Sequence, residues 1–425
     1  MKYLLLLGAS QFQRERSIAG AEKAFNGPIV VCSSDTNGQP NNYSRFSISI
    51  ENETDPTEVL NSVQKFNTQF NATPICVVPL NDFVLESAYL VSNTFNINSN
   101  TLETIRAARL KNLMKDKFRD NNIPHSKSYV CNNYEEVQDV AKKINSWPLI
   151  IKPVNFGGSG GVVKIESSEK LLECYSTTQE HLSKYAKKYN SIDDQVIIEQ
   201  FIDFKDEISV EVINTPESRK IIGITKKFLG PEPYFAEIGH LAAEYIIEDD
   251  IFKSTIHEVA TSVCSAFQIN YGIAHVEMKI DIINKKIIVL EVGARPAGDS
   301  IIDLWEKAID INLYSLHCQS YLGILDLSKI DFSIKYTAGI GYFTFPYARI
   351  DQISPLKPII SEESLIEKIN LRCQVDQLTS PPKDWTTRYG FINYFENSKT
   401  LNLKLLKLNE LTSKITNKIF KIERL

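Results

Sequence analysis

The seven cysteines of this 425-residue chain are scattered, and no two of them form a CxxC motif. An odd, unclustered set is atypical of a disulfide framework or a zinc site and favours a reducing, cytoplasmic compartment. No apolar run approaches the roughly 20 residues of a membrane-spanning helix, and the run from Tyr3 to Leu7 is too short for a signal-peptide core. We therefore expect a cytoplasmic protein without a membrane partner.

The chain also lacks an excess of basic residues. It contains 47 Lys and Arg against 52 Asp and Glu, which gives a formal net charge of -5. Without a basic field nothing attracts a polyphosphate backbone, so no nucleic-acid partner is expected. Hydrophobic residues make up 43% of the chain, which is ordinary for a globular protein and allows two or three domains with separate cores.

The dinucleotide-binding motif is missing from a region that otherwise favours it. Apolar strands are predicted at 3–7, 28–32 and 74–78, with helical stretches between them, and this order predicts a doubly wound sheet. Gly8 follows the first strand, but the next glycine is Gly20. The GxGxxG spacing therefore fails, and a nicotinamide or flavin site is excluded at this position.

A glycine-rich loop follows the predicted strand 149–152. Residues 157–161 include four glycines, and glycine backbone N–H groups can approach phosphate oxygens closely. Lys152, at the mouth of the loop, would supply a point charge for a phosphate. The arrangement is not a P-loop, because its lysine precedes the glycines. An ordinary mobile hairpin is the alternative interpretation.

Upstream of this loop, one basic helix is predicted from Asn100 to about Asn121, before Pro124. A solvated face is the ordinary interpretation of such a charge run. Its basic side chains are Arg106, Arg109, Lys111, Lys115, Lys117 and Arg119.

Residues 273–300 predict two antiparallel strands with a tight turn. Strand alternation places Glu277 and Glu291 on one shared face and the apolar residues between them on the core side. If the two glutamates are directly opposed, the loop holds an odd number of residues centred on Asn284, which tolerates a left-handed conformation. Opposed like charges cost roughly 0.2–1 kcal/mol unless a cation such as Mg²⁺ lies between them. A solvated sheet face with unrelated charges is the alternative.

The order of these features resembles the ATP-grasp superfamily over roughly residues 1–325. The resemblance implies an α/β and α+β fold: a doubly wound N-terminal domain at 1–100, an ATP-grasp domain at 101–325 with a lid subdomain at about 125–195, and a C-terminal α+β domain at 326–425. It also implies ATP and Mg²⁺ (or Mn²⁺) as cofactors. The implied nucleotide-binding residues are Lys111, Lys152, Gly157, Gly158, Ser159, Gly160, Gly161, Glu199, Gln200, Phe201, Ile202 and Glu207.

The same resemblance makes Glu277 and Glu291 the metal ligands, and it gives Arg295, together with Lys152, a catalytic role at the transferred phosphoryl group. One departure concerns Gly293, which stands where the family usually has an asparagine as a third metal ligand. The number of metal ions that bind is therefore open.

Residues 235–240 and 272–277 resemble the branch of carboxylate–amine ligases that includes bacterial dipeptide ligases and carnosine synthase. There, Glu237 and His240 would act near the substrate amine or carboxylate; loop polar groups that only fix a turn are the alternative. The branch implies small-molecule carboxylate and amine substrates, an acylphosphate intermediate and release of ADP and phosphate. Other possibilities are a carboxylase-type or purine-pathway-type enzyme, and a catalytically impaired nucleotide-binding scaffold. A homodimer is compatible with the resemblance.

Overall fold

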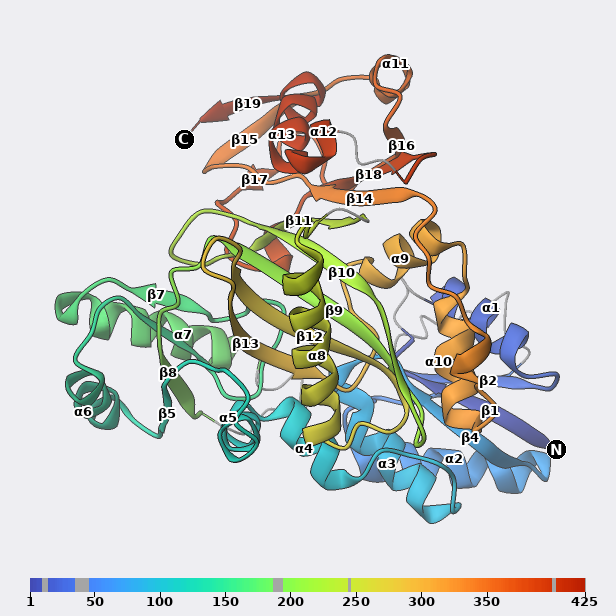
Figure 1. Cartoon of the computed structure of the whole chain (residues 1–425). Helices are drawn as coiled ribbons and strands as arrows, with labels where there is room; N and C mark the ends of the chain where they lie inside the picture. Colours follow the sequence, from blue (N-terminus) through green and yellow to red (C-terminus); the bar gives the residue numbers. More distant parts are fainter. Residues whose placement is uncertain (10–13, 35–45, 186–193, 244–245, 400–402, 425) are drawn as a thin grey trace.

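The structure is a computed structural model, and its strands form four sheets with helices packed around them (Figure 1). In Figure 1 the N-terminal part lies at the lower right, a small green subdomain at the left and the C-terminal part at the top. Within the described part of the chain, no helix is long and apolar enough to cross a membrane. The described residues are 1–9, 14–34, 46–185, 194–243, 246–399 and 403–424.

The N-terminal sheet is parallel, with the strand order β3-β2-β1-β4. The side chains of 4–7 are fully buried, as expected for a parallel sheet with both faces covered, so the predicted buried strands are confirmed. The elements are β1 (Lys2–Leu7), α1 (Arg14–Ala24), β2 (Ile29–Ser33), β3 (Phe46–Ser49), α2 (Pro56–Phe70), β4 (Thr73–Pro79), η1 (Asp82–Val84) and α3 (Leu85–Thr94).

A small antiparallel sheet, ordered β5-β8-β6-β7, forms the green subdomain of Figure 1. Strands β6 and β7 pair on either side of the glycine-rich loop, so this loop joins two strands as predicted. Its elements are β5 (Ser128–Cys131), α6 (Tyr134–Ile144), β6 (Leu149–Pro153), β7 (Val163–Ile165), η2 (Ser168–Lys170), α7 (Leu171–Tyr185) and β8 (Val196–Gln200).

The central sheet has eight strands in the order β13-β12-β9-β10-β11-β14-β18-β16. Strand β11 pairs with β14, so one sheet runs across the predicted boundary at 325/326; the predicted domain limits stay a prediction. The elements are β9 (Asp206–Asn214), β10 (Arg219–Leu229), β11 (Glu237–Ala242), α8 (Asp250–Ala266), β12 (Gly272–Asp281), β13 (Lys286–Gly293), α9 (Ile301–Ile309), α10 (Leu313–Leu322), η3 (Leu327–Lys329), β14 (Thr337–Tyr342), β16 (Ile366–Leu371) and β18 (Gly390–Glu396).

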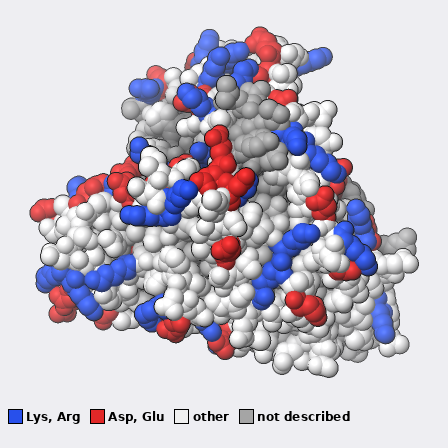
Figure 2. Space-filling model, viewed as in Figure 1, with Lys and Arg blue, Asp and Glu red and all other residues white. Residues whose placement is uncertain are grey.

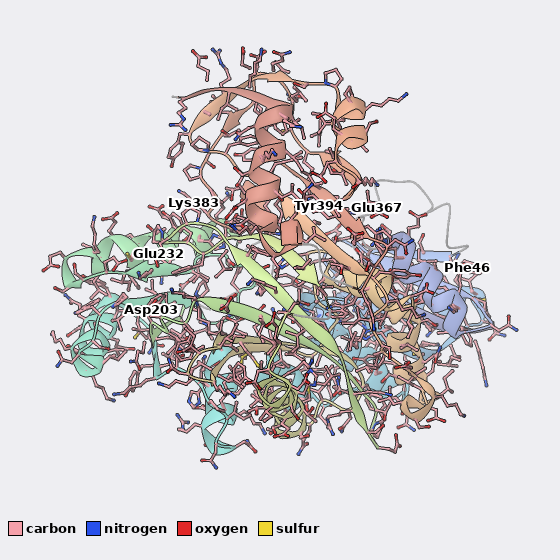
Figure 3. All side chains as sticks on the ribbon, turned by 45° about the horizontal axis from the view of Figure 1, so that its top comes forward. Phe46, Asp203, Glu232, Glu367, Lys383 and Tyr394 are labelled. Atoms are coloured by element: carbon pink, nitrogen blue, oxygen red, sulfur yellow. The ribbon has the colours of Figure 1, made fainter. Side chains whose placement is uncertain are left out.

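The C-terminal part adds a three-stranded sheet, β17-β15-β19. The segment after β17 contacts the loop between β10 and β11: Figure 3 shows Lys383 above Glu232, and the Lys383 Nζ lies 5.3 Å from the centre of the Tyr234 ring. The same segment reaches the small subdomain, where His181 Nδ1 lies 3.8 Å from Asp384 Oδ2. The remaining elements are β15 (Ala348–Ile353), α11 (Leu356–Glu362), β17 (Leu378–Thr379), η4 (Trp385–Thr387), α12 (Leu403–Leu406), α13 (Leu408–Ile419) and β19 (Phe420–Arg424).

The predicted single helix from 100 to 121 is wrong: the structure has α4 (Leu102–Arg109) and α5 (Lys111–Asp120). Leu110 between them is extended, with φ -92° and ψ 113°. The break has a cause in the small subdomain, because the Lys111 backbone N–H donates to the Val154 carbonyl oxygen at 2.9 Å. The break lets α5 start at Lys111, whose side chain turns inward and is buried.

Candidate functional site

Two adjoining cavities lie between the small subdomain, the central sheet and the N-terminal part. The first, the small-sheet cavity, is lined by every predicted nucleotide residue except Gly161. The second, the inner cavity, is lined by Arg295 and by residues of the N-terminal part. Glu237, Glu277 and Glu291 line both cavities, whereas His240 is fully buried behind Glu237. The structure thus brings the predicted site residues together.

Three lysines converge on two carboxylates at the small-sheet cavity. Lys152 Nζ lies 3.2 Å from Glu199 Oε1 and 3.1 Å from Glu291 Oε1. Burial alone would lower the pKa of Lys152, but these two carboxylates raise it above its usual value. Lys111 Nζ donates to the Phe156 carbonyl oxygen at 2.5 Å and lies 3.4 Å from Glu291 Oε2. The cluster therefore carries more positive than negative charge, which suits an anionic ligand.

Lys115 is the third lysine, and the sequence did not single it out. Its Nζ lies 3.3 Å from Glu199 Oε1 and donates to the Leu290 carbonyl oxygen at 3.1 Å. Burial lowers the pKa of Lys115. For Glu199, burial acts to raise the pKa, but Lys115 and Lys152 bring it down to about 2. The sequence could have indicated Lys115, because a residue four positions after Lys111 lies on the same face of a helix.

Glu277 and Glu291 are directly opposed across β12 and β13, as predicted. The predicted loop is wrong, because Asp281 pairs with Lys286 and leaves a four-residue turn, 282–285. A bulge after Glu277 shifts the register by one residue. Lys285, and not Asn284, takes the left-handed conformation, with φ 53°.

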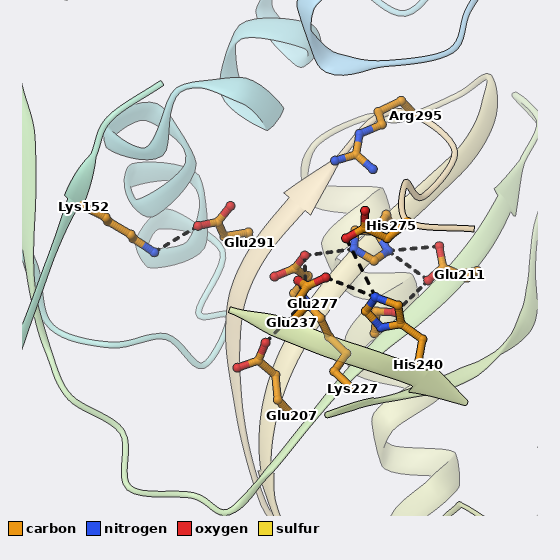
Figure 4. A network of polar contacts seen from close by, with 12 residues as sticks. Lys152, Glu207, Glu211, Lys227, Glu237, His240, His275, Glu277, Glu291 and Arg295 are labelled. Atoms are coloured by element: carbon orange, nitrogen blue, oxygen red, sulfur yellow. Dashed lines mark hydrogen bonds and ion pairs between the residues drawn. The ribbon is translucent and has the colours of Figure 1, made fainter. Parts of the chain in front are cut away.

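Lys227 on β10 is buried among three carboxylates (Figure 4). Its side chain is 1% exposed, and its Nζ lies 2.6 Å from Glu237 Oε1, 3.1 Å from Glu277 Oε1 and 3.3 Å from Glu207 Oε1. Burial acts to raise the pKa of Glu237 and of Glu277, but Lys227 leads the effects that hold both well below their usual value. Burial, in contrast, raises the pKa of Glu207.

His275 extends this network toward the core. Its Nδ1 lies 2.9 Å from Glu211 Oε1, and its Nε2 lies 2.9 Å from Glu277 Oε1. Burial alone would lower the pKa of His275, but the two carboxylates raise it to about 9. Glu277 is thus held by two cations on its inner side while 23% of its side chain stays exposed.

A second acidic group, Glu237 with Asp299, lies in front of buried cations. His240 Nε2 lies 3.2 Å from Glu237 Oε2 and 3.8 Å from Asp299 Oδ2. Arg388, from the C-terminal part, places Nη1 2.8 Å from Asp299 Oδ2. Burial acts to lower the pKa of His240, but the neighbouring carboxylates of Asp299 and Glu237 raise it overall. Burial raises the pKa of Asp299, but Arg388 leads the effects that lower it overall.

Arg295 is oriented by a carboxylate from the N-terminal part. Its Nε lies 2.7 Å from Asp82 Oδ2, and its Nη1 donates to the Pro296 carbonyl oxygen at 3.1 Å. A Cβ atom placed on Gly293 would lie 3.5 Å from Asp82 Oδ1 and 3.5 Å from Arg295 Nε. The side chain missing at Gly293 would therefore point toward the Asp82 carboxylate, which the sequence did not single out.

The comparisons with known proteins agree with this geometry at the level of the family. Residues 145–303 match the model of the ATP-grasp domain. The L-arginine-specific L-amino acid ligase of Bacillus subtilis is 26% identical over 273 residues, covering 64% of this chain and 62% of that relative. A formate-dependent phosphoribosylglycinamide formyltransferase of Methanocella arvoryzae is 26% identical over 212 residues, covering 47% of this chain and 46% of that relative. The chain thus spans less than two thirds of each relative's length.

Solved structures match over the whole chain. The L-amino acid ligase of Bacillus licheniformis has a TM-score of 0.77 at 17% identity, covering 100% of this chain and 98% of that one. A carboxyaminoimidazole ribonucleotide synthase complexed with ATP, from Aspergillus clavatus, has a TM-score of 0.70 at 15% identity, covering 98% of each chain. At these identities the matches show the shared fold, which mixes helices and strands as the sequence predicts.

Proposed function

Because this chain carries an ATP-grasp domain, we propose that it is an ATP-dependent ligase that joins the carboxylate of an amino-acid-like substrate to an amine. The observation that carries the proposal is the meeting of two cavities at one carboxylate pair. Beside Glu277 and Glu291, the small-sheet cavity is lined by Lys152, and the inner cavity is lined by Arg295 and Asp299. Both cavities are lined by Lys111, Gly157, Gly158 and Glu237. A phosphoryl donor in one cavity and the substrate carboxylate that accepts the phosphoryl group in the other would meet at the pair.

ATP would occupy the small-sheet cavity. Lys111 and Lys152 pair with Glu291, and a phosphate would offer these two point charges more negative charge than one carboxylate does. The loop at 157–161 would cover the phosphates with backbone N–H groups, and closure of such a loop excludes water from a reactive intermediate. Phe201, Ile202 and Glu207, which also line this cavity, would bind the adenosine part.

The carboxylate pair fits the divalent ion that ATP-grasp enzymes use. Glu277 and Glu291 are directly opposed, and 23% and 29% of their side chains stay exposed in walls that both cavities share. Mg²⁺ prefers one or two carboxylates together with substrate phosphates, and when bound it would neutralise phosphate charge. Gly293 offers no oxygen, whereas the Asp82 carboxylate lies where a side chain at 293 would reach.

The remaining chemistry needs positioning and charge neutralisation. The substrate carboxylate attacks the γ-phosphorus, an O–P bond forms, and ADP leaves. Arg295 would stabilise the transferred phosphoryl group. The amine nitrogen then attacks the acyl carbon, the C–O bond to phosphate breaks, and the nitrogen loses a proton as the amide forms.

The acidic group favours an amino-acid substrate over formate or bicarbonate. Ligand atoms of Glu237, His240 and Asp299 lie within 4.8 Å of one another, but Lys227 and Arg388 already pair with the two carboxylates. The two carboxylates still keep 12% and 30% of their side chains exposed, so they can accept hydrogen bonds from an ammonium group. We therefore propose that the group binds the ammonium of the substrate whose carboxylate is activated.

The test is ADP release from ATP and Mg²⁺ with pairs of amino acids, with the products identified by mass. A condensed product with one water fewer than the two substrates is expected, and Glu291→Gln and Arg295→Ala should abolish it. ADP release stimulated by formate or bicarbonate would instead favour the purine-pathway or carboxylase type. Absence of any stimulated release would leave the nucleotide-binding scaffold. Turnover retained in both variants would contradict the site assignment.

A further inference from the structure

Arg109, at the end of α4, is a cation on the inner cavity to which the proposed reaction gives no role. It lines this cavity together with Phe83 and Met114, its side chain is 15% exposed, and its guanidinium carbon lies 6.0 Å from the centre of the Phe83 ring. Its Nε is buried and has no hydrogen-bond partner among the described residues. Buried donors are normally paired, so an unpaired guanidinium nitrogen calls for an explanation.

The charge around Arg109 is unbalanced. Its Nη1 lies 3.7 Å from Glu86 Oε1, while Arg106 Nη2 donates to the other oxygen of Glu86 at 3.1 Å. Two guanidinium groups therefore share one carboxylate, which leaves one positive charge. Arg106 is 49% exposed and is not among the residues that line the cavity. The surplus charge is thus presented to the cavity by Arg109.

The other cations of the inner cavity are occupied. Arg295 is paired with Asp82 at 2.7 Å, Lys111 is paired with Glu291 on the phosphate side, and His275 is paired with Glu211 and Glu277. Arg109 is therefore the cation best placed to bind a carboxylate in this cavity. A guanidinium suits that task because its planar donors match the two oxygens of a carboxylate.

The lining of the cavity carries charges of both signs on separate elements. The acidic group of Glu237 and Asp299 belongs to β11 and the loop after β13, and Arg109 belongs to α4. Figure 1 shows β11 above the centre and α4 near the bottom, so the two elements lie apart. Glu291 and Arg295, where the amide would form, also line this cavity. A dipeptide with its free ammonium at one end and its free carboxylate at the other matches this distribution of charge.

We propose that Arg109 binds the α-carboxylate of the amine substrate, so that this substrate is an amino acid or a peptide and not a simple amine. The inference rests on the proposed function. The carboxylate in question belongs to the amine substrate because the carboxylate of the other substrate is consumed at the phosphoryl group. Arg109 positions the attacking nitrogen without touching the reacting atoms, and the acceptor preference depends on it.

The experiment compares two acceptors: the amino acid that the wild-type enzyme uses best in the pairwise screen, and the carboxamide of that same amino acid. The wild type should prefer the acid by about 10- to 100-fold in kcat/KM, the range for a charge-assisted hydrogen bond. Arg109→Gln should lose this preference through a raised KM for the acid, and Arg109→Lys should retain part of it. Arg106→Gln is the matched control, because it touches the same glutamate from outside the cavity.

Three results would overturn the inference: a wild type that uses acid and amide equally, an Arg109→Gln enzyme that keeps the preference, or an Arg106→Gln enzyme that loses it equally. Melting temperatures of the variants identify loss of folding, and the ratio of the two acceptors within one variant is independent of the fraction folded. Failure of the proposed function is a separate result: hydroxylamine would then trap no hydroxamate from the wild type, ATP and any amino acid.

Discussion

Replacing Lys227 by methionine removes the one cation that Glu207, Glu237 and Glu277 share while keeping most of the side-chain volume. Lys227 is 1% exposed, so solvent does not screen these contacts. Loss of one partner of a buried ion pair costs about 3–5 kcal/mol, because it leaves an uncompensated charge. The side chains of the three glutamates are 11%, 12% and 23% exposed, and Glu277 keeps His275 as a partner. We therefore expect the lower end, about 3 kcal/mol.

The loss of stability in Lys227→Met should depend on pH, whereas a loss caused only by poorer packing would not. In the wild type, Lys227 holds the pKa of Glu237 well below its usual value, so this carboxylate contributes stability that is present above its unfolded pKa and lost as pH falls. Without Lys227, burial and the repulsion among the three carboxylates favour protonated carboxyls, and at Glu237 the cations His240 and Arg388 oppose this only in part. The variant should then lose stability as pH rises. The difference between the two proteins should widen from pH 5 to pH 8.

Urea unfolding in EDTA at pH 5, 6.5 and 8 measures this difference. Lys226→Met is the matched control, since Lys226 is 28% exposed and pairs at 3.2 Å with Asp206, which is 30% exposed. Such a surface pair contributes about 0–1 kcal/mol. A Lys227→Met protein no less stable than the Lys226→Met protein, or equally destabilised at every pH, would refute the argument.

Two further predictions concern stability away from the cavities. Burial raises the pKa of Glu306 to about 7, so its folded form favours the neutral acid, and stability present below its unfolded pKa is lost as pH rises through 7. Glu306→Gln keeps an acceptor for the Leu313 N–H and should be more stable than wild type at pH 8 by about 1–3 kcal/mol; equal urea midpoints would contradict this. Gly223→Ala would place a Cβ atom 2.1 Å from the Trp305 ring and should cost about 1–3 kcal/mol, whereas an unchanged calorimetric melting temperature would contradict the clash.

Local periodicity was sufficient for much of the fold. Strand alternation predicted that Glu277 and Glu291 share a face, because side-chain direction along a strand follows from the backbone alone. The turn between the two strands was not predictable in the same way. A bulge after Glu277 changes the register by one residue, and bulges depend on contacts beyond the hairpin. Here Lys115, from another element, binds the carbonyl oxygen of Leu290 in the bulged strand.

Several ion-pair partners in the site come from distant segments of the chain, and the periodicity of the sequence does not predict contacts between such segments. Lys227 lies in an ordinary strand pattern, and only the sheet order places it against Glu277. Arg388 reaches Asp299 from the C-terminal part. Charged groups are interspersed over the visible surface (Figure 2), so a lysine or arginine in the sequence does not reveal whether it will be buried and paired.

The N-terminal sheet lacks the glycine motif of a dinucleotide site, and the chain at the end of its first strand packs differently as a result. Ligands in open α/β sheets bind outside the carboxyl ends of the strands, and β4 ends at Pro79, just before Asp82. Gly8, with φ 73°, lets the chain after β1 pack closely on Asn81, whose amide donates to the Gly8 carbonyl oxygen at 3.1 Å. The loop after β4 therefore lies against the end of β1, and it projects Asp82 toward Arg295. This loop thus contributes a wall of the inner cavity.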